Sequence, residues 1–503
     1  MGELLVDQLR LMADRYPGEI AYRHLDADLE ITFEAWERAS NALARGLVAQ
    51  GVKRGDRVGI ALPGSLLLDW ITVYAAIHKA GAVAVPLNTR LTVAELRALL
   101  GHAEPVAVLT SEDLHPAIDA ARAGVDSVRL VTTDLAGLAD DDESEFQVPV
   151  EMDDLADIMY TSGTTGLPKG VAVRHRTIAL IPNNEPAWTG ERWLHASPLF
   201  TFAGIGFIYN PMKMGMTGMY QARFDAGRWL SYVERERPTM AFIVPAMAQL
   251  LVHHERWHDA DLSSLVLLSV GSAPLPPETL FALLERLPHA SVSNSYGMTE
   301  AGPAFCVMPK EEAARRIGSV GLPMPPMEVR IVDPATGGEV PVGTEGEVLI
   351  RLEGRQREYY RDPEATSRTW EEGWLHTGDI GRLDADGFLY IAGRIKDVII
   401  RGGNNIHAGD VEAVLYRHPG VLEAAAVGVP HPTLGEDVAA AVVPKPGVTL
   451  DPEELTAFCR ERLADYKVPR RVLLVDELPR NATGKVIKRE LLPWFTPSSG
   501  STR

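Results

Sequence analysis

The amino-acid sequence predicts an α/β protein with a large N-terminal part and a small C-terminal part. Three observations lead to this prediction. Helical and strand patterns alternate over the first 150 residues, strands with alternating polarity follow from about residue 317, and the charge balance changes near residue 395. The chain has 503 residues. Since domains commonly contain about 100–200 residues, this length suffices for two to four folding units.

The N-terminal third alternates short apolar runs with amphipathic stretches. We expect helices over residues 36–50, 67–79 and 94–100, and strands over residues 57–62, 82–87 and 106–110. This alternation indicates right-handed βαβ units and a mostly parallel sheet. The pattern returns between residues 178 and about 292, where residues 241–246 and 265–271 are predicted to be buried strands.

The section after residue 317 has a different hydrophobic pattern. Residues 327–333, 346–352 and 387–393 alternate apolar and polar side chains and are separated by Gly, Pro and Asp turns. Such strands are typical of an antiparallel, barrel-like sheet. The sequence Asp-Ala-Asp-Gly at 384–387 predicts a hairpin turn inside it.

Charge marks a domain boundary. The last 109 residues contain 14 Lys or Arg and 14 Asp or Glu, so the whole formal net charge of −19 lies on residues 1–394. We therefore predict an N-terminal domain over residues 1–394 and a small α/β domain over residues 395–503.

Composition excludes several classes of function. A surface with a net charge of −19 repels nucleic acid and anionic lipid. Two cysteines cannot build a disulfide framework or a thiolate metal cluster, so a reducing cytoplasm is the expected location. The N-terminal 19 residues predict an amphipathic helix rather than a signal peptide. The apolar windows at 66–87 and 202–220 are interrupted by polar residues, so no integral membrane segment is expected.

The segment most suggestive of chemistry is Thr-Ser-Gly-Thr-Thr-Gly-Leu-Pro-Lys-Gly at 161–170, directly after a short apolar strand. Glycines let backbone N–H groups approach a phosphate, hydroxyls donate hydrogen bonds, and Lys169 adds positive charge. The spacing differs from the Walker phosphate loop. The pair Gly204 and Gly206 also lacks the third glycine of a dinucleotide fingerprint, since Tyr209 stands there.

This segment resembles the phosphate loop of the adenylate-forming superfamily, which includes acyl-CoA synthetases, peptide-synthetase adenylation domains and firefly luciferase. Further motifs of that superfamily follow in order at 271–275, 296–300, 377–379, 393–397, 401–405 and 479–485. The resemblance extends from about residue 5 to 493 and is greatest to fatty-acid–CoA ligases of the actinobacterial type. It implies two doubly wound sheets and a distorted β-barrel, followed by a small mobile C-terminal α/β domain.

The resemblance also implies which residues bind ATP and Mg²⁺. Tyr296 packs against adenine, Asp379 accepts from the ribose hydroxyls, and Glu300 binds Mg²⁺, a hard cation that prefers oxygen ligands. The implied ATP site comprises Thr161, Ser162, Gly163, Thr164, Thr165, Lys169, Ser272, Ala273, Asn294, Tyr296, Thr299, Asp379, Arg394 and Lys485. The implied catalytic residues are Lys485, Thr299 and Glu300.

Two half-reactions at one site are implied for the C-terminal domain. Lys485 offsets charge between the substrate carboxylate and the α-phosphate during adenylation. Rotation about Lys396 then removes Lys485 and brings in the CoA-facing residues. The residues implied on the CoA side are Thr201, Arg401, Gly402 and Gly403.

The acid substrate is the least defined part of the prediction. An apolar acyl pocket is expected from Trp188, Phe202, Ile205, Phe207, Met247, Gly271, Gly297 and Ala301. No buried cation is evident for a second carboxylate, which disfavours dicarboxylates. We expect AMP-forming ligation of a medium- or long-chain fatty acid to CoA. The alternatives are an aromatic or alicyclic acid, a carrier-loading adenylating enzyme and a non-catalytic binding protein. The expected partners are ATP, CoA and the acid, with a homodimer left open.

Two other motifs point elsewhere. His-Glu-Arg-Trp-His at 254–258 matches the H-E-x-x-H zinc motif at the end of a helix predicted over 246–257, but no third-ligand motif follows. We interpret it as a chance match. The glycosylation sequon at 481–483 lies beside Lys485 and is interpreted as unused.

Overall fold

The βαβ units predicted near the N-terminus form the first sheet. The computed structural model describes residues 3–161, 169–178, 181–303, 306–354, 356–480 and 485–495. In the strand order β20-β8-β7-β4-β3-β5-β6, the strands from β7 to β6 are parallel, whereas β8 pairs antiparallel with both β7 and β20. The strands are β3 (Arg57–Ala61), β4 (Val83–Pro86), β5 (Ala107–Thr110), β6 (Leu130–Thr132), β7 (Leu155–Thr161), β8 (Lys169–Arg174) and β20 (Glu358–Tyr359).

The second sheet has the order β13-β12-β11-β9-β10-β1-β2, and only β2 is antiparallel. Its strands are β1 (Ile20–His24), β2 (Leu29–Thr32), β9 (Arg192–His195), β10 (Thr217–Tyr220), β11 (Met240–Ile243), β12 (Leu267–Gly271) and β13 (Ser291–Ser295). The strand predicted over 241–246 ends at Ile243, because Pro245 is pre-organised for the first turn of the next helix.

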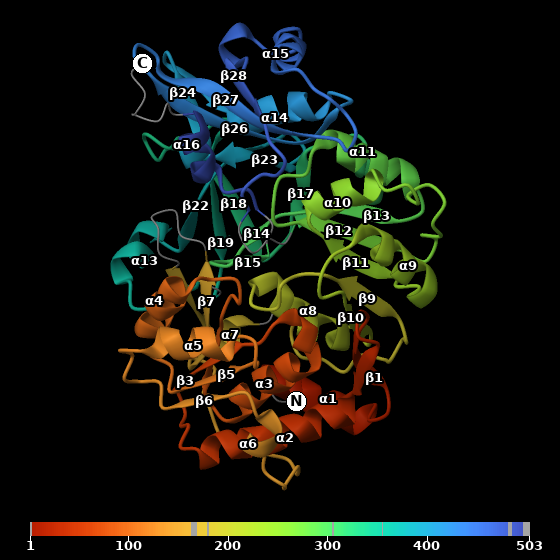
Figure 1. Cartoon of the computed structure of the whole chain (residues 1–503), viewed down its shortest axis with the longest axis vertical. Coiled ribbons are helices and arrows are strands. Elements are labelled where there is room, and N and C mark those ends of the chain that lie inside the picture. Colours follow the sequence, from red (N-terminus) through yellow and green to blue (C-terminus); the bar gives the residue numbers. More distant parts are fainter. Residues whose placement is uncertain are drawn as a thin grey trace.

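Helices cover both sheets, and several begin at side-chain caps. Thr32, Thr92 and Asp225 each accept a hydrogen bond from a backbone N–H in the first turn. The helices are α1 (Leu5–Arg15), α2 (Phe33–Ala49), α3 (Leu67–Lys79), α4 (Val93–Ala103), α5 (His115–Arg122), α6 (Leu135–Leu138), α7 (His175–Ile178), α8 (Phe202–Lys213), α9 (Ala226–Glu236), α10 (Pro245–Val252) and α11 (Pro277–Arg286). Trp36 and Trp70 are fully buried between them. Figure 1 shows these elements in the lower and right-hand parts of the molecule.

The predicted antiparallel section forms a third sheet in the order β16-β17-β23-β22-β19-β18, with β21 paired to β22. Its strands are β16 (Cys306–Val307), β17 (Ser319–Pro323), β18 (Met327–Val332), β19 (Gly346–Leu352), β21 (Trp370–Glu371), β22 (Trp374–Leu383) and β23 (Leu389–Arg394). The predicted turn at 384–387 joins β22 to β23, and Gly387 N donates to Asp384 O at 3.0 Å. Two helices and a small hairpin flank this sheet: α12 (Lys310–Ala313), α13 (Pro363–Thr369), β14 (Gly297–Met298) and β15 (Gly302–Pro303).

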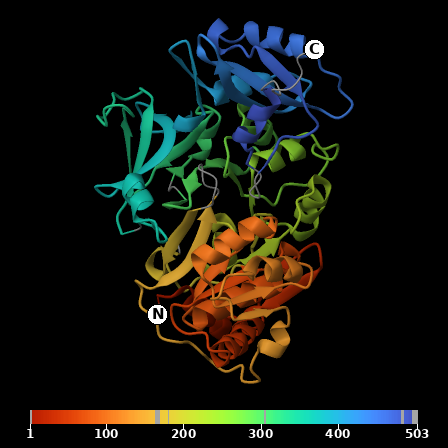
Figure 2. The same ribbon diagram turned by 60° about the vertical axis from the view of Figure 1, so that its left-hand side comes forward.

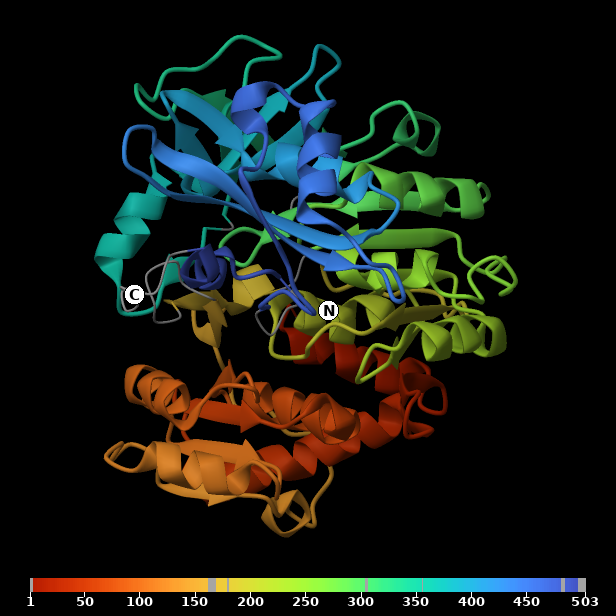
Figure 3. The ribbon, with the colours of Figure 1, turned by 45° about the horizontal axis from the view of Figure 1, so that its top comes forward.

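The C-terminal sheet starts after the short 3-10 helix η2 (Ile395–Asp397) and has the order β25-β24-β27-β26, with β28 parallel to β27. Its elements are β24 (Val398–Arg401), β25 (Asn404–His407), α14 (Ala408–Tyr416), β26 (Val421–His431), β27 (Gly435–Pro444), α15 (Pro452–Arg460), β28 (Arg471–Leu474) and α16 (Leu492–Phe495). Among the described residues, the hydrophobic clusters of this sheet contain no residue before Ile399, and those of the other sheets contain none after Ile391. Figure 2 shows this C-terminal part at one end of the molecule, and in Figure 3, where that end is turned forward, it lies in front.

The fold class predicted from the sequence is confirmed, including the two sheets rich in parallel strands and the curled antiparallel sheet. No helix among the described residues is both long enough and apolar enough to cross a bilayer.

Candidate active site

The ends of the predicted phosphate loop are held in register by two paired strands. Thr161 ends β7 and lies opposite Lys169, the first residue of β8. The Thr161 hydroxyl donates to the Lys169 carbonyl at 3.5 Å. Ser162, Gly163, Thr164 and Thr165 lie outside the described residues.

On the nucleotide side, the structure brings Tyr296, Asp379 and Arg394 together. The Tyr296 hydroxyl donates to Asp379 Oδ2 at 2.6 Å, and Arg394 Nε lies 3.1 Å from Asp379 Oδ1. Burial raises the pKa of Tyr296 well above its ordinary value, and the Asp379 carboxylate raises it further. Since each carboxylate oxygen has two lone pairs, Asp379 can still accept from a sugar hydroxyl.

Ser272, Ala273 and Asn294 lie at the carboxyl edge of the second sheet, the edge where α/β sheets bind ligands. Ser272 follows the last residue of β12 and has φ of 75°, in the left-handed region. Such a conformation in a residue other than glycine costs about 1–3 kcal/mol and is concentrated at functional sites. Asn294 pairs with Val270 on the neighbouring strand.

Lys485 comes from the C-terminal part of the chain and lies beside Arg394 and Asp379. Burial lowers the pKa of Lys485 to about 8, and Arg394 lowers it further, while Asp379 and Asp397 oppose the shift. A cavity of about 330 Å³ next to it is lined by Arg394, Lys396, Asp397, Lys485 and residues of the C-terminal sheet. The geometry therefore brings together an acceptor for sugar hydroxyls, an aromatic ring and several cations.

Glu300, which follows Thr299, presents a hard carboxylate donor near Lys169, since both contact Tyr359. The Glu300 carboxylate accepts from the Tyr359 hydroxyl through Oε1 at 2.8 Å. Its other oxygen has no hydrogen bond to a residue that the structure describes. Carboxylate and hydroxyl oxygens suit Mg²⁺, which usually keeps one or two protein carboxylates and completes its shell with phosphate and water. The described residues contain no group of three or more His, Cys, Asp or Glu that could hold a metal ion. A single carboxylate fits a Mg²⁺ ion whose other ligands come from phosphate and water.

The predicted acyl residues do not all converge. Phe207 packs against Phe242 of β11 at a ring distance of 4.8 Å, and the Phe242 ring edge lies beside Gly271. Trp188 instead packs against Tyr16 of α1 at 6.0 Å and Phe33 of α2 at 5.6 Å.

The remaining predicted acyl residues are spread over several parts of the molecule. Ile205 and Phe202 belong to the same hydrophobic cluster as α1 and α2, and Met247 packs with the helix-side core of the second sheet. Ala301 belongs to the barrel cluster, and Gly297 is exposed. The acyl assignments remain predictions.

The residues predicted on the CoA side have structural partners here. Thr201 caps α8, accepting from Gly204 N at 3.0 Å and donating to Pro198 O at 2.7 Å. Arg401 is paired with Asp437 at 2.6 Å. Gly402 and Gly403 join β24 to β25 with φ of 55° and 82°, as a two-residue turn with φ above zero at both positions requires.

The predicted hinge residue Lys396 lies in η2, the connection between the barrel and the C-terminal sheet. Burial lowers its pKa, and Arg394 lowers it further. Since no described hydrophobic cluster crosses this connection, its position suits a hinge.

The prediction of a helix over 246–257 is wrong in its extent. Helix α10 ends at Val252, with His253 as C-cap, so His254 and His258 lie in the turns that follow. The His254 ring accepts through Nδ1 from Arg256 N. The helical face that a zinc protease motif needs is therefore missing from this described segment.

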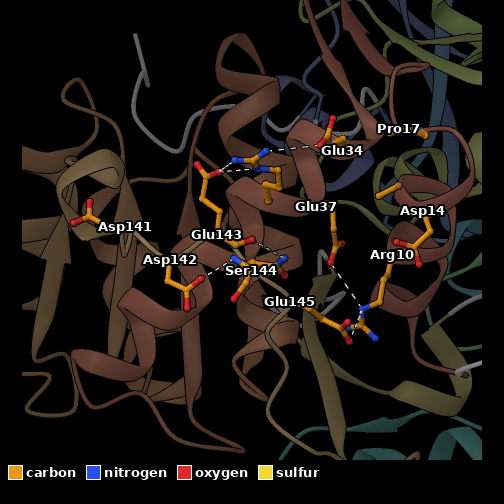
Figure 4. A pocket seen from close by; sticks show the side chains of 13 residues that line it. Arg10, Asp14, Pro17, Glu34, Glu37, Asp141, Asp142, Glu143, Ser144 and Glu145 are labelled. Carbon is orange, nitrogen blue, oxygen red and sulfur yellow. Dashed lines mark hydrogen bonds and ion pairs between the residues drawn. The ribbon is translucent and has the colours of Figure 1, made fainter.

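A second cavity, of about 520 Å³, contains none of the predicted site residues among its lining side chains (Figure 4). Acidic side chains of α2 and the 141–145 loop dominate it, and many form internal ion pairs. Arg38 pairs with Glu143, and the buried Lys79 pairs with Glu37 at 2.7 Å. We therefore assign it no role in the chemistry.

Sequence reasoning missed three side chains near the site. Arg357 is buried, stacks over the Phe202 ring at 4.3 Å and donates to the carbonyls of Thr299 and Thr177. Tyr359 contacts Glu300 and Lys169, and Ser269 lies beside Phe242 in the second sheet. No local sequence pattern predicts these residues, because Tyr359 belongs to a two-residue strand and Arg357 flanks it.

Two family matches account for most of the chain. Residues 9–360 match the AMP-binding enzyme family, and residues 410–485 match the AMP-binding enzyme C-terminal domain. The chain belongs to the AMP-binding enzyme family. It is an AMP-forming acid–thiol ligase of the acyl-CoA synthetase type, and such enzymes use ATP, Mg²⁺ and CoA.

Its relatives differ in the acids that they are named for. A feruloyl-CoA synthase of Amycolatopsis sp is 40% identical over 480 residues, covering 94% of this chain and 96% of that protein. The long-chain-fatty-acid–CoA ligase FadD13 of Mycobacterium tuberculosis (strain H37Rv) is 32% identical over 496 residues, covering 96% and 97%. The crystal structure of the anthranilate CoA ligase AuaEII with anthranoyl-AMP superposes with a TM-score of 0.87 at 28% identity, covering 97% of this chain and 96% of that one.

Proposed function

We propose that this ligase acts on an aromatic carboxylic acid whose ring carries a polar substituent, such as a hydroxycinnamic acid, and transfers it to CoA. One face of the second sheet carries the proposal. Ser269, Phe242 and His195 lie side by side on β12, β11 and β9 in register. The flanking residues of these strands, such as Val270 and Ile243, point into the opposite, helix-covered core.

This face combines flat apolar rings with hydroxyl groups. Ser269 Oγ lies 2.5 Å from Ser295 Oγ and accepts from Ser293 Oγ at 3.3 Å. Phe207 of α8 covers Phe242. A face of this composition suits a planar ring whose hydroxyl group donates to or accepts from the serines, or whose methoxy oxygen accepts from them.

The same arrangement disfavours the fatty acid that the sequence predicts. The ring of Phe242 lies next to Gly271 and contacts Phe207. The ring centres of Phe207 and His195 are 5.0 Å apart. A long aliphatic chain would have to pass this ring cluster, and it would gain no hydrogen bond from the serines. The higher identity to the feruloyl-CoA synthase than to FadD13 supports the same choice.

We propose that the residues of the site have these roles in adenylation. A substrate carboxylate oxygen attacks the α-phosphorus of ATP, and pyrophosphate leaves. Lys485, Arg394 and Lys169 stabilise the negative charge, and Tyr296 and Asp379 hold the nucleoside. Thr299 would hydrogen-bond a phosphate, and Glu300 would hold Mg²⁺, which would screen the triphosphate charge.

The second half-reaction uses the other face of the C-terminal domain, which we propose to span residues 395–503. Rotation about Lys396 removes Lys485 and brings the turn at Gly402 and Gly403 to the site. The CoA sulfur then attacks the acyl carbon, and AMP leaves. Gating of one site by a domain connection is a common way to separate two steps.

The serine contact is tested by a substituent series. We expect 4-hydroxycinnamate to have a higher kcat/KM than cinnamate, and Ser269→Ala to reduce that ratio by about 2- to 10-fold, since one hydrogen bond contributes about 0.5–1.5 kcal/mol. Thioester formation is measured with CoA and, separately, with a phosphopantetheinylated carrier protein. An unchanged ratio in Ser269→Ala contradicts the ring contact, and activity with the carrier alone contradicts the CoA-ligase proposal.

A further inference from the structure

The strand β20 lies where the barrel section returns to the first sheet. It pairs antiparallel with β8, with Tyr359 opposite Val171 and Glu358 opposite Ala172. Tyr360 N donates to Gly170 O at 2.7 Å. Since β8 begins at Lys169, this pairing places β20 next to the end of the predicted phosphate loop.

Tyr359 joins two charged residues of the proposed ATP site. Its hydroxyl donates to Glu300 Oε1 at 2.8 Å, and the Lys169 ammonium lies 4.7 Å from the centre of its ring. A hydroxyl that donates a hydrogen bond to one carboxylate oxygen restricts the rotation of the carboxylate and thereby orients its other oxygen. An ammonium over a phenol ring is held by the negative face of the ring.

Arg357 binds the backbone of the loop that carries Thr299 and Glu300. Residues 357 and 359 are two apart along an extended segment, so their side chains share one face. Arg357 Nη1 donates to the Thr299 carbonyl at 2.7 Å, and the guanidinium stacks on Phe202 at 4.3 Å. Arg357 therefore holds the backbone of the loop at Thr299, and Tyr359 holds the carboxylate of Glu300.

We propose that Tyr359 is a positioning residue for adenylation, orienting the Glu300 carboxylate toward Mg²⁺ and placing the Lys169 ammonium toward the triphosphate. The inference rests on the proposed metal role of Glu300. The serines of the second sheet do not enter it. Tyr359 itself touches neither substrate nor metal in this assignment.

The test separates the hydroxyl from the ring. Tyr359→Phe removes the hydrogen bond to Glu300 and keeps the ring under Lys169. Tyr360→Phe is the matched control, because it removes a phenol hydroxyl from the adjacent residue of the same strand flank, whose ring packs against His102 instead. Binding of Mn²⁺ to each protein with a non-hydrolysable ATP analogue is measured by electron paramagnetic resonance, and binding of AMP without metal by calorimetry.

We expect Tyr359→Phe to weaken Mn²⁺ binding by about 10-fold or more, as loss of partners behind a metal ligand does elsewhere. AMP binding and the melting temperature are expected to match those of Tyr360→Phe. Mn²⁺ affinity equal to that of the control overturns the inference, as does an equal loss of AMP and Mn²⁺ binding, which indicates a general distortion. If the wild-type protein binds Mn²⁺ with the analogue and Glu300→Gln does so equally well, the metal role of Glu300 in the proposed function is wrong instead.

Discussion

Lys485 shows how far single residues could be predicted from the sequence. Its loop motif predicted a role at the nucleotide, and the structure places it beside Asp379 and Arg394, although it lies more than 90 positions away from them in the chain. Tyr359 could not be predicted in the same way. Its role depends on the pairing of β20 with β8, and a two-residue strand carries too little periodicity to reveal its partner.

Replacing Lys485 tests its role in one half-reaction. In Lys485→Ala, we expect the adenylation rate to fall by about 10²–10³, because a cation that stabilises developing charge is lost. Thioester formation from supplied acyl-adenylate should continue at nearly the wild-type rate. Both steps are followed in single-turnover experiments by quenched flow. Equal losses in the two steps contradict the assignment.

The lowered pKa of Lys485 predicts a pH dependence. The amine must carry a proton to stabilise negative charge, and its pKa of about 8 means that it loses this proton above about pH 8. The kcat/KM for ATP in pyrophosphate release should therefore be level below about pH 8 and fall above it. In Lys485→Arg the falling limb should disappear, since guanidinium stays charged. A wild-type profile that stays level to about pH 10 contradicts this account.

At the scale of elements, strongly periodic segments were predicted well and short ones were not. Helix α3 has the predicted bounds of Leu67–Lys79, and the three alternating strands of the barrel section are present. Helix α10 is shorter than predicted because its pattern continues into turns that hydrogen bonds of His254 and Arg256 stabilise. Such local bonds compete with the helix and leave little trace in hydrophobic periodicity.

The connection η2 carries the prediction about the hinge. Lys396 is the second residue of this 3-10 helix, and proline at this position would fix φ. In Lys396→Pro, adenylate should still form, while thioester production falls by at least about tenfold because rotation is restricted. Lys396→Ala is the control for loss of the side chain alone. If both steps run at the wild-type rate in the proline variant, the hinge lies elsewhere.

At the scale of the whole molecule, ion pairs connect the C-terminal sheet to the rest. His407 Nε2 lies 2.9 Å from Glu345 Oε2, and Arg417 Nε lies 2.9 Å from Glu278 Oε1. These pairs favour the orientation that places Lys485 beside Asp379 and Arg394. The sequence could not predict them, because which surface charges meet depends on the relative placement of the two parts.

The His407 pair predicts that this orientation is favoured at lower pH. The hydrogen bond that His407 donates to Glu345 raises the pKa of His407 above its ordinary 6.5, as does the charge of Asp410, while burial and Lys467 oppose the shift. The stabilisation is therefore complete below about pH 6.5 and is lost as the pH rises through the raised pKa. Since Glu345 is half exposed, the effect should be about 0.2–1 kcal/mol.

Resonance energy transfer between fluorescent labels on the two parts measures the distribution of their relative orientations. This distribution should change with pH in the wild type and should be independent of pH in His407→Gln. Arg417→Gln, which removes a pair without a titrating group, should shift the distribution equally at every pH. A wild-type distribution that does not change with pH contradicts the prediction.

The central claim concerns the acid, and a direct competition tests it. The enzyme is given ATP, Mg²⁺ and limiting CoA with equimolar 4-hydroxycinnamate and dodecanoate, and the two thioesters are quantified by mass spectrometry at low conversion. The ratio of products equals the ratio of the two kcat/KM values. We predict that the aromatic thioester exceeds the aliphatic one by at least about tenfold, since the ring hydroxyl gains a hydrogen bond from the serines and the alkyl chain gains none while having to pass the ring cluster. An excess of dodecanoyl-CoA would contradict the account and restore the fatty acid that the sequence predicts.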